Sequence, residues 1–281
     1  MANCVAGRRE LPPGWSDGLP PPMVVVMALT ALRSLFAPKR APAAVPVGQR
    51  VYAIGDIHGR LDLFDELVGR IDIDRARARP VVVLLGDYVD RGLGSAELLE
   101  RLSSGGLPDW ADWVCLRGNH EQAMLDALEP EADKALVRWR EFGGRDTMRS
   151  YGVPSPLSFG DDMPGLRADL LTRIPPRHLD WLRSLPLSHR IGDYLFVHAG
   201  IRPKVALTDQ DPFDLLWIRE EFLTSRVNHG VMVVHGHSIE LAADERSNRI
   251  GIDTGAYKTG VLTALALDGT ARRFLQTMPE A

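Results

Sequence analysis

Five short clusters of polar residues each follow directly after an apolar run in this sequence. They read GDIHG (55–59), GDYVDRG (86–92), RGNHE (117–121), HAG (198–200) and HGH (235–237). A turn or a helix cap would explain any one of them, because Gly, Asn and Asp are common in both. Packing alone does not account for five clusters of compatible residue types. Together they indicate one shared polar site.

The clusters supply oxygen and nitrogen donors without a thiolate: Asp56, His58, Asp87, Asn119, His198 and His237. Such donors favour a borderline or hard divalent ion, with Mn²⁺ expected first and Fe²⁺ or Zn²⁺ as alternatives. Six donors are too many for one catalytic ion that keeps an open position, so we expect two ions sharing a bridging carboxylate. Two such ions, roughly 3.5–4 Å apart, suit displacement at phosphorus by a metal-bound hydroxide.

The chain also carries groups that a phosphate ester needs. Arg91, Arg117 and Arg219 are candidate guanidinium groups for the phosphate oxygens. His120 directly follows a predicted metal ligand, so it is placed to protonate a leaving alkoxide as the general acid. Asp90 is the carboxylate expected to hold that imidazole and keep it protonated.

The elements that must position these clusters are predicted to be β-strands. The apolar runs before the clusters cover 51–54, 81–85, 113–116, 194–197 and 231–234. Segments between the early runs, such as RLDLFDELVGRI (60–71), carry apolar residues at helical spacing. Alternating strands and helices predict an α/β domain, in which ligands bind beyond the carboxyl ends of the strands. The five clusters are therefore expected to converge.

At these residues the sequence resembles the calcineurin-like metallophosphoesterases, and within them the phosphoprotein phosphatase family. The family motifs GDxHG, GDxxDRG and GNHE occur here in order, followed by two further histidine clusters, and the resemblance covers roughly residues 50–270. It implies an α/β fold, a β-sandwich of two mixed sheets flanked by helices, with a dimetal site at the carboxyl ends of the strands.

The resemblance also implies a role for each residue. Asp56 and His58 would bind the first ion, Asp87 would bridge both, and the second ion would be bound by Asn119, His198 and His237. His120 and Asp90 would form the acid pair, and the three arginines would bind phosphate. Arg219 is placed by DLLWIRE (214–220), which is similar to the DxxWxR segment of bacterial and phage members.

Three functions are compatible with this resemblance. The first is a serine/threonine protein phosphatase acting on a phosphoprotein, favoured by DRG and GNHE and by the phage-like ending IDTGAYKTG (252–260). The alternative is a hydrolase of a small phosphoester, such as a dinucleoside polyphosphate (diadenosine tetraphosphate). Enzymes of that kind often carry Asp where Glu121 stands. An inactive phospho-ligand-binding module has little support, because every predicted ligand and the acid are present.

Composition and charge limit which partners and which cellular compartment are expected. The net charge of −4 argues against a sequence-independent nucleic-acid binder, so no nucleic-acid partner is expected. The two cysteines, Cys4 and Cys115, lie in dissimilar surroundings and are not expected to pair. This pattern favours a reducing compartment and predicts a cytoplasmic location.

The first 48 residues are predicted to be an N-terminal extension, and residues 49–281 the catalytic domain. The extension has a Pro/Gly-rich segment, a short amphipathic helix over 23–37 interrupted by Arg33, and a linker. The helix is too short for a membrane span. Docking onto the body and peripheral membrane contact are both open roles for residues 23–37. A signal peptide is a weaker alternative, because no clear cleavage site follows the apolar stretch.

Overall fold

The computed structural model describes residues 42–153 and 155–278. The Pro/Gly-rich segment and the predicted amphipathic helix, with its proposed membrane contact, lie outside the described residues. Among the residues that are described, no helix combines the length and the apolar character needed to cross a membrane.

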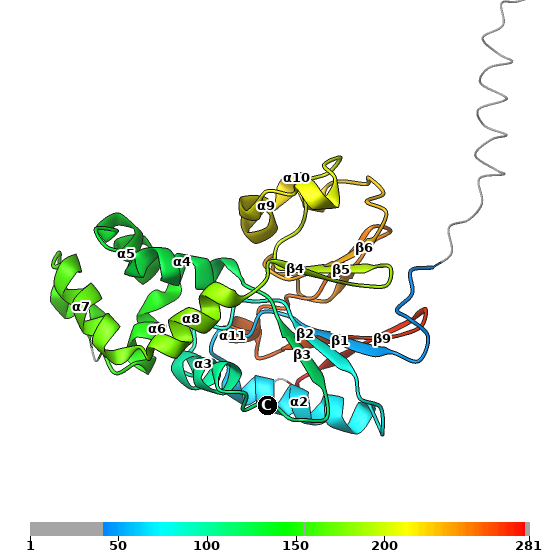
Figure 1. Cartoon of the computed structure of the whole chain (residues 1–281), viewed down its shortest axis with the longest axis horizontal. Helices are drawn as coiled ribbons and strands as arrows, with labels where there is room; N and C mark the ends of the chain where they lie inside the picture. The colour runs from blue at the N-terminus through cyan, green and yellow to red at the C-terminus, as the bar shows by residue number, and fades with distance from the viewer. Residues whose placement is uncertain (1–41, 154, 279–281) are drawn as a thin grey trace, which may run out of the picture. The chain divides into compact units, whose positions relative to one another are not determined.

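Within the described residues, the strands form two five-stranded sheets (Figure 1). The first sheet has the order β10-β9-β1-β2-β3 and the second has the order β4-β5-β6-β8-β7. The strands of the first sheet are β1 (Arg50–Ile54), β2 (Val81–Leu84), β3 (Asp112–Cys115), β9 (Thr263–Asp268) and β10 (Ala271–Gln276). Those of the second are β4 (Ser188–Ile191), β5 (Tyr194–Val197), β6 (Met232–His235), β7 (Asp244–Glu245) and β8 (Arg249–Gly251).

Both sheets are mixed, and their parallel strands carry the polar clusters. In the first sheet β1, β2 and β3 run parallel, whereas β9 and β10 are antiparallel additions. In the second sheet β5, β6 and β8 run parallel, and β4 and β7 are antiparallel edge strands. The carboxyl ends of parallel strands meet at one edge of a sheet, so each sheet gathers its own clusters there.

The side chains of β1 show how the layers form. Val51 and Ala53 face the second sheet and join a core with Phe196 and Val234. Tyr52 faces the opposite way, into a core with the helices. This alternation follows from the two-residue period of a strand. A third core lies between the second sheet and the helices α9 (Pro212–Trp217) and α10 (Glu220–Leu223). The predicted sandwich of two mixed sheets flanked by helices is confirmed.

Helices cover the outer face of each sheet, and a further group of helices lies to one side of the sheets (Figure 1). They are α2 (Leu61–Asp74), α3 (Ser95–Ser103), α4 (Asn119–Leu128), α5 (Asp133–Trp139), α6 (Arg145–Ser150), α7 (Met163–Arg173), α8 (Pro176–Ser184), α9 (Pro212–Trp217), α10 (Glu220–Leu223) and α11 (Ala256–Thr259). The segment η1 (Arg140–Gly144) is a kink between α5 and α6, and η2 (Pro156–Phe159) and η3 (Leu207–Asp209) are short 3₁₀ helices. The group from α4 to α8 packs together beside the strand ends that carry the clusters.

The short segment before β1 is attached to the sheets. Val45 is buried between them, and its backbone N–H donates to the carbonyl of Gly269 at 3.0 Å. The backbone N–H of Ala44 donates to Asp193 Oδ2 at 3.1 Å. The sequence places these residues in the extension, but their contacts lead us to propose that the catalytic domain begins near residue 43.

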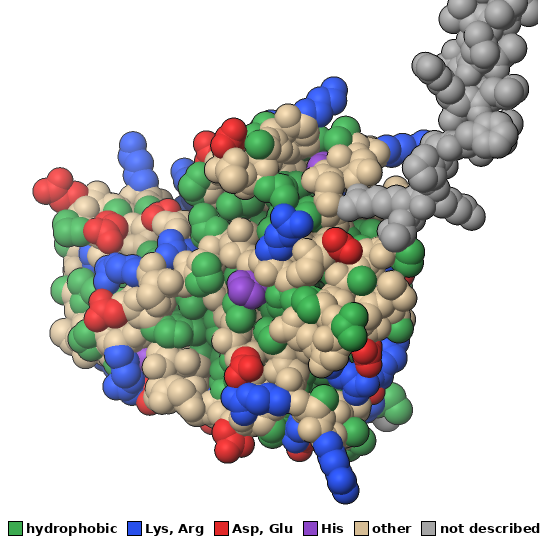
Figure 2. Space-filling model, turned by 45° about the vertical axis from the view of Figure 1, so that its right-hand side comes forward, with side chains coloured by type: hydrophobic (Ala, Val, Ile, Leu, Met, Phe, Trp, Pro, Cys, Tyr) green, Lys and Arg blue, Asp and Glu red, His purple; other side chains and the backbone are tan. Residues whose placement is uncertain are grey.

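Charged side chains of both signs are interspersed on the face drawn in Figure 2, with hydrophobic side chains between them. This distribution is in keeping with the small net charge of −4. The expectation that the chain has no nucleic-acid partner stays a prediction.

Candidate metal centre

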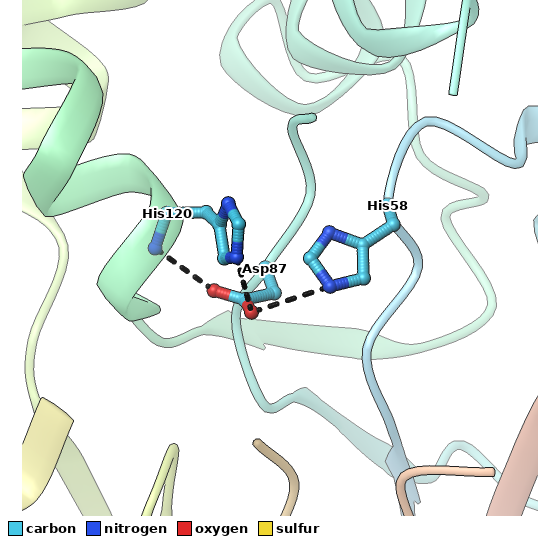
Figure 3. Close-up of side chains that lie close together, drawn as sticks. All are labelled: His58, Asp87 and His120. Carbon is cyan, nitrogen blue, oxygen red and sulfur yellow. Dashed lines mark hydrogen bonds and ion pairs between the residues drawn. The ribbon is translucent and has the colours of Figure 1, made fainter. Parts of the chain in front are cut away.

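Asp87 lies between two groups of histidines at the strand ends, and Figure 3 draws the first group, His58 and His120. Its Oδ2 atom is 3.4 Å from His58 Nε2 and 3.9 Å from His120 Nε2. Its Oδ1 atom is 3.4 Å from His198 Nε2. These distances show that each oxygen faces one of the two groups. The carboxylate is buried. This is the arrangement that a bridging carboxylate requires.

Asn119 organises the second group. Its Oδ1 atom lies 2.8 Å from His198 Nε2 and 2.9 Å from His237 Nδ1. All three side chains are buried. Among the described residues, Asn119 Nδ2 and His237 Nε2 have no hydrogen-bond partner. The predicted ligands therefore converge on one place, with polar atoms there that the protein itself leaves unsatisfied.

The protonation of His198 indicates a cation between these groups. Its Nδ1 atom lies 3.0 Å from the carbonyl of Leu85, and since a carbonyl only accepts, Nδ1 carries the hydrogen. Burial lowers the pKa of His198, so the ring is neutral and Nε2 holds a lone pair. That lone pair faces the acceptor oxygens of Asn119 and Asp87. A cation between them resolves the repulsion, as in metal sites where histidine donates its other N–H to a carbonyl.

His58 repeats this pattern in the first group. Its Nδ1–H donates to the carbonyl of Val89 at 2.9 Å. Burial lowers the pKa of His58 to about 3, so its Nε2 atom also carries a lone pair and faces Asp87. The Arg91 guanidinium donates to this atom at 3.0 Å, and it also lies 3.0 Å from His120 Nε2. It also stands 4.6 Å from the ring centre of Tyr257. Arg91 therefore lies beside both histidines of the first group, and its role in phosphate binding stays a prediction.

Asp56 completes the first group. It accepts the backbone N–H of His237 at 3.0 Å through Oδ2. Burial and the negative charges of Asp253 and Asp87 raise the pKa of Asp56 well above its usual range. A Cβ atom on Gly236 would lie only 2.0 Å from Asp56 Oδ1, so glycine is needed for this close approach. Three crowded carboxylates and neutral imidazoles fit divalent cations.

His120 is held by a carboxylate, as the acid prediction requires. Its Nδ1–H donates to Asp90 Oδ2 at 2.6 Å. Asp90 is fully buried and also accepts from Trp139 Nε1 at 3.1 Å and from Thr147 Oγ1 at 2.7 Å. Burial lowers the pKa of His120, but the charges of Asp87 and Asp90 outweigh this effect and raise it above its usual value. The protonated imidazole that a general acid needs is favoured.

Trp139 and Thr147 were missed by sequence reasoning as parts of the site. Trp139 ends α5 and Thr147 lies in α6, within the segment WREFGGRDTMRSYG (139–152). The Gly pair and aromatic residues of this segment suit a substrate-facing cap, but Trp139 reads as an ordinary core residue. The hydrogen bonds of both side chains to Asp90 become visible only in the structure.

Glu121 fixes the backbone around the bridging carboxylate. Its buried side chain accepts the backbone N–H groups of Asp87 at 2.8 Å, Tyr88 at 2.7 Å, Val89 at 3.2 Å and Gly118 at 2.8 Å. It thereby ties the loop after β2 to the first turn of α4. Glu121 is not one of the proposed metal ligands, but it positions the backbone that carries Asp87 and Asn119.

Several site residues have an unusual backbone conformation. Among the described non-glycine residues, those with a positive φ include His58 (48°), Asp87 (53°), Asp90 (73°), Arg91 (68°) and His237 (62°). This region disfavours L-residues other than glycine and concentrates at functional sites. The strain turns these side chains back toward the common edge of the sheets.

The other two predicted phosphate-binding arginines, Arg219 and Arg117, differ in where their guanidinium groups lie. Arg219 is exposed at the start of α10, and its positive charge lowers the pKa of His237 after the larger effects of burial and His198. Arg117 donates to the carbonyl of Leu182 at 3.1 Å and to Gln122 Oε1 at 2.9 Å, and it also contacts the last carbonyls of α8. The structure therefore does not bring the Arg117 guanidinium into the site.

A sandwich of two mixed sheets with this donor set at its strand ends defines a metallophosphoesterase. The sequence model of the calcineurin-like phosphoesterase family matches residues 49–257, and the chain belongs to this family. It is therefore a hydrolase of the metallophosphoesterase class. The family uses divalent metals, and the residues described above fit them. The choice of Mn²⁺ stays an expectation.

Curated relatives extend this comparison. The symmetrical bis(5'-nucleosyl)-tetraphosphatase of Acidovorax sp. (strain JS42) is 33% identical over 159 residues, which cover 55% of this chain and 45% of that protein. The chain thus spans about half the length of this relative. The protein of the same name from Methylococcus capsulatus is 27% identical over 292 residues, covering 80% of this chain and 94% of that protein.

Two solved structures share the fold. The crystal structure of a candidate diadenosine tetraphosphatase has a TM-score of 0.57 and 20% identity, covering 85% of this chain and 99% of that one. A protein serine/threonine phosphatase of Saccharomyces cerevisiae has a TM-score of 0.51 and 16% identity, covering 93% and 91%. At these identities the two structures support the fold alone.

Proposed function

We propose that this chain is a metal-dependent hydrolase of dinucleoside polyphosphates such as diadenosine tetraphosphate. The observation that carries the proposal is the match to relatives named symmetrical bis(5'-nucleosyl)-tetraphosphatase, one of which aligns over 80% of this chain. This is the alternative that the sequence offers. The serine/threonine protein phosphatase expected first rests on the motifs DRG and GNHE, on the ending IDTGAYKTG, and on a fold that a solved protein phosphatase shares at 16% identity.

The site supplies what this reaction needs. We propose that the first ion is held by Asp56, His58 and Asp87, and the second by Asp87, Asn119, His198 and His237. Two bound divalent ions would polarise a phosphoryl group and activate a water molecule. Arg91 and Arg219 would bind the oxygens of the polyphosphate, whose charge a guanidinium matches well.

His120 supplies the proton that the leaving group takes. Water adds to one of the two central phosphorus atoms and releases one proton to solvent, and the bond from that phosphorus to the central bridging oxygen breaks. His120 gives its proton to that oxygen, which leaves with the second nucleoside diphosphate, while Asp90 holds the ring in place, and the ring then regains a proton from solvent. Two nucleoside diphosphates result. The leaving phosphate is a weaker base than an alkoxide, so it needs this proton less than a phosphoserine would.

The proposal is tested with full-length protein reconstituted with Mn²⁺. The values of kcat/KM are measured for diadenosine tetraphosphate, a phosphoserine peptide and p-nitrophenyl phosphate, and the nucleotide products are separated. We expect the dinucleotide to be cleaved fastest, with ADP as its only nucleotide product. Faster cleavage of the phosphopeptide would contradict the proposal and favour the protein phosphatase function instead. Metal-loaded protein that cleaves none of the three would support the binding module.

A further inference from the structure

An apolar pocket opens beside the general acid. It has a volume of about 160 Å³ and is lined by Ala123, Asp126, Ala135, Arg138, Trp139, Phe142 and Trp217. Four elements contribute to it: α4, α5, η1 and α9. None of the residues that we propose as metal ligands lines it, so the pocket is a separate chamber next to the metal centre.

Aromatic rings connect this pocket to the reacting groups. The Phe142 ring stacks on His120, with centroids 4.4 Å apart and an angle of 10° between the rings. Trp217 lies 6.1 Å from Phe142 and 6.3 Å from His237. The row ends at Phe213, 6.3 Å from Trp217 and 67% exposed. Exposed aromatic faces of this kind are suited to stacking against a planar ring.

The pocket wall is also rigidly tied to the acid pair. Trp139 lines the pocket and donates its Nε1–H to Asp90, the partner of His120. The peptide carbonyl of Gly143, the residue after Phe142, accepts the backbone N–H of Arg91 at 3.2 Å. Gly143 has a φ of 128°, a conformation that glycine adopts readily, and the chain kinks there between α5 and α6. A group seated in the pocket would be held at a fixed distance from the phosphate under attack.

We propose that this pocket is a nucleobase subsite, which rests on and deepens the proposed function. The walls offer aromatic and aliphatic surface, and a nucleobase is a planar ring carrying polar edge groups. The two charged residues at the pocket have opposite signs, Asp126 and Arg138, which suits a neutral occupant with donors and acceptors rather than a phosphate. The base of one nucleotide would stack there while its polyphosphate reaches the metal centre.

The test compares two ligands that differ by the nucleoside alone. Binding of ADP and of inorganic pyrophosphate to Mn²⁺-loaded full-length protein is measured by isothermal titration calorimetry. Base–aromatic stacking predicts that ADP binds on the order of tenfold more tightly than pyrophosphate. Ala135→Leu fills the pocket from α5 and is expected to remove this advantage while pyrophosphate binds as before. Ala132→Leu, the same substitution outside the pocket lining, keeps the wild-type ratio.

The outcomes separate the subsite from the proposed function. If ADP keeps its advantage in Ala135→Leu, or has none in the wild type, the subsite is wrong even where diadenosine tetraphosphate is cleaved. If the advantage depends on the pocket but the dinucleotide is not cleaved, the proposed function fails and the subsite stands. Should Ala135→Leu not fold, Ala123→Leu fills the same pocket from α4 and carries the same expectation.

Discussion

Each oxygen of the Asp87 carboxylate faces a different histidine group, and this single residue links the two halves of the site. The lone pairs of His58 and His198 point toward it because each ring donates its other N–H to a backbone carbonyl. These carbonyls belong to Val89 and Leu85, so the backbone itself sets the tautomers. The ligand set is thus prepared by hydrogen bonds that require no ion.

Replacing His120 with Asn tests the acid at the residue scale. We expect kcat to fall by about 10²–10⁴ for an alkyl phosphate, the usual cost of losing general acid catalysis, with metal content unchanged. Since p-nitrophenolate leaves without help, the loss on p-nitrophenyl phosphate should be smaller. Kinetics on both substrates, with metal analysis, measure this. Equal losses on the two substrates would contradict an acid role.

The pH profile tests the pairing of His120 with Asp90. A raised pKa means that the protonated acid is present at low pH and is lost as the pH rises through that pKa. Asp90→Asn removes a charge that raises the pKa, so the alkaline limb of kcat/KM should move to lower pH. Wild-type and variant profiles on an alkyl phosphate measure the shift. A limb that stays in place would show that another group titrates there.

At the scale of elements, the loops after the strands depend on Glu121. It accepts four backbone N–H groups without exposure to water. Glu121→Gln keeps the volume but turns an NH₂ group toward donors, so the free energy of unfolding should fall by about 2 kcal/mol or more. Urea denaturation measures this. Glu129→Gln, at an exposed position, is the control and should change stability by less than about 0.5 kcal/mol. If the two variants are equally stable, the four hydrogen bonds of Glu121 do not hold these loops in place.

Arg117 distinguishes a structural role from phosphate binding. Its guanidinium binds the last carbonyls of α8, so Arg117→Ala should lower the free energy of unfolding by about 1–3 kcal/mol and leave KM nearly unchanged. Arg91→Ala, the comparison at the site, should raise KM instead. Urea denaturation and steady-state kinetics on the same samples separate the two effects. A raised KM with unchanged stability in Arg117→Ala would restore the phosphate role predicted from the sequence.

The sequence predicts the elements best where hydrophobic pattern and motif coincide. The five strands before the clusters occur where expected, because each is a continuous apolar run bounded by glycine or a polar cluster. The other strands of the described residues, β4, β7, β8, β9 and β10, were not predicted. SHRI in β4 and ARRFLQ in β10 are largely polar and form strands by pairing with β5 and β9. The orientation of the Arg117 side chain could not be predicted from the sequence either, because it depends on where α8 packs.

At the scale of the whole molecule, the site belongs to neither sheet alone. The first sheet supplies the loops after β1, β2 and β3, and the second supplies those after β5 and β6. The core between the sheets brings these loops together. Binding of the two metal ions therefore depends on the packing of the two sheets. Divalent metal should in turn stabilise the folded protein by mass action. The motifs predicted this convergence, whereas the apolar pocket beside it needed the structure.

The central claim is that Asp87 is shared by two ions. The most direct measurement is anomalous X-ray scattering from a crystal of the full-length protein grown with Mn²⁺. We predict two peaks, one touching each oxygen of Asp87, with Asp56 and His58 beside the first and Asn119, His198 and His237 around the second. A single peak, or ions that leave Asp87 without contact, would contradict the account.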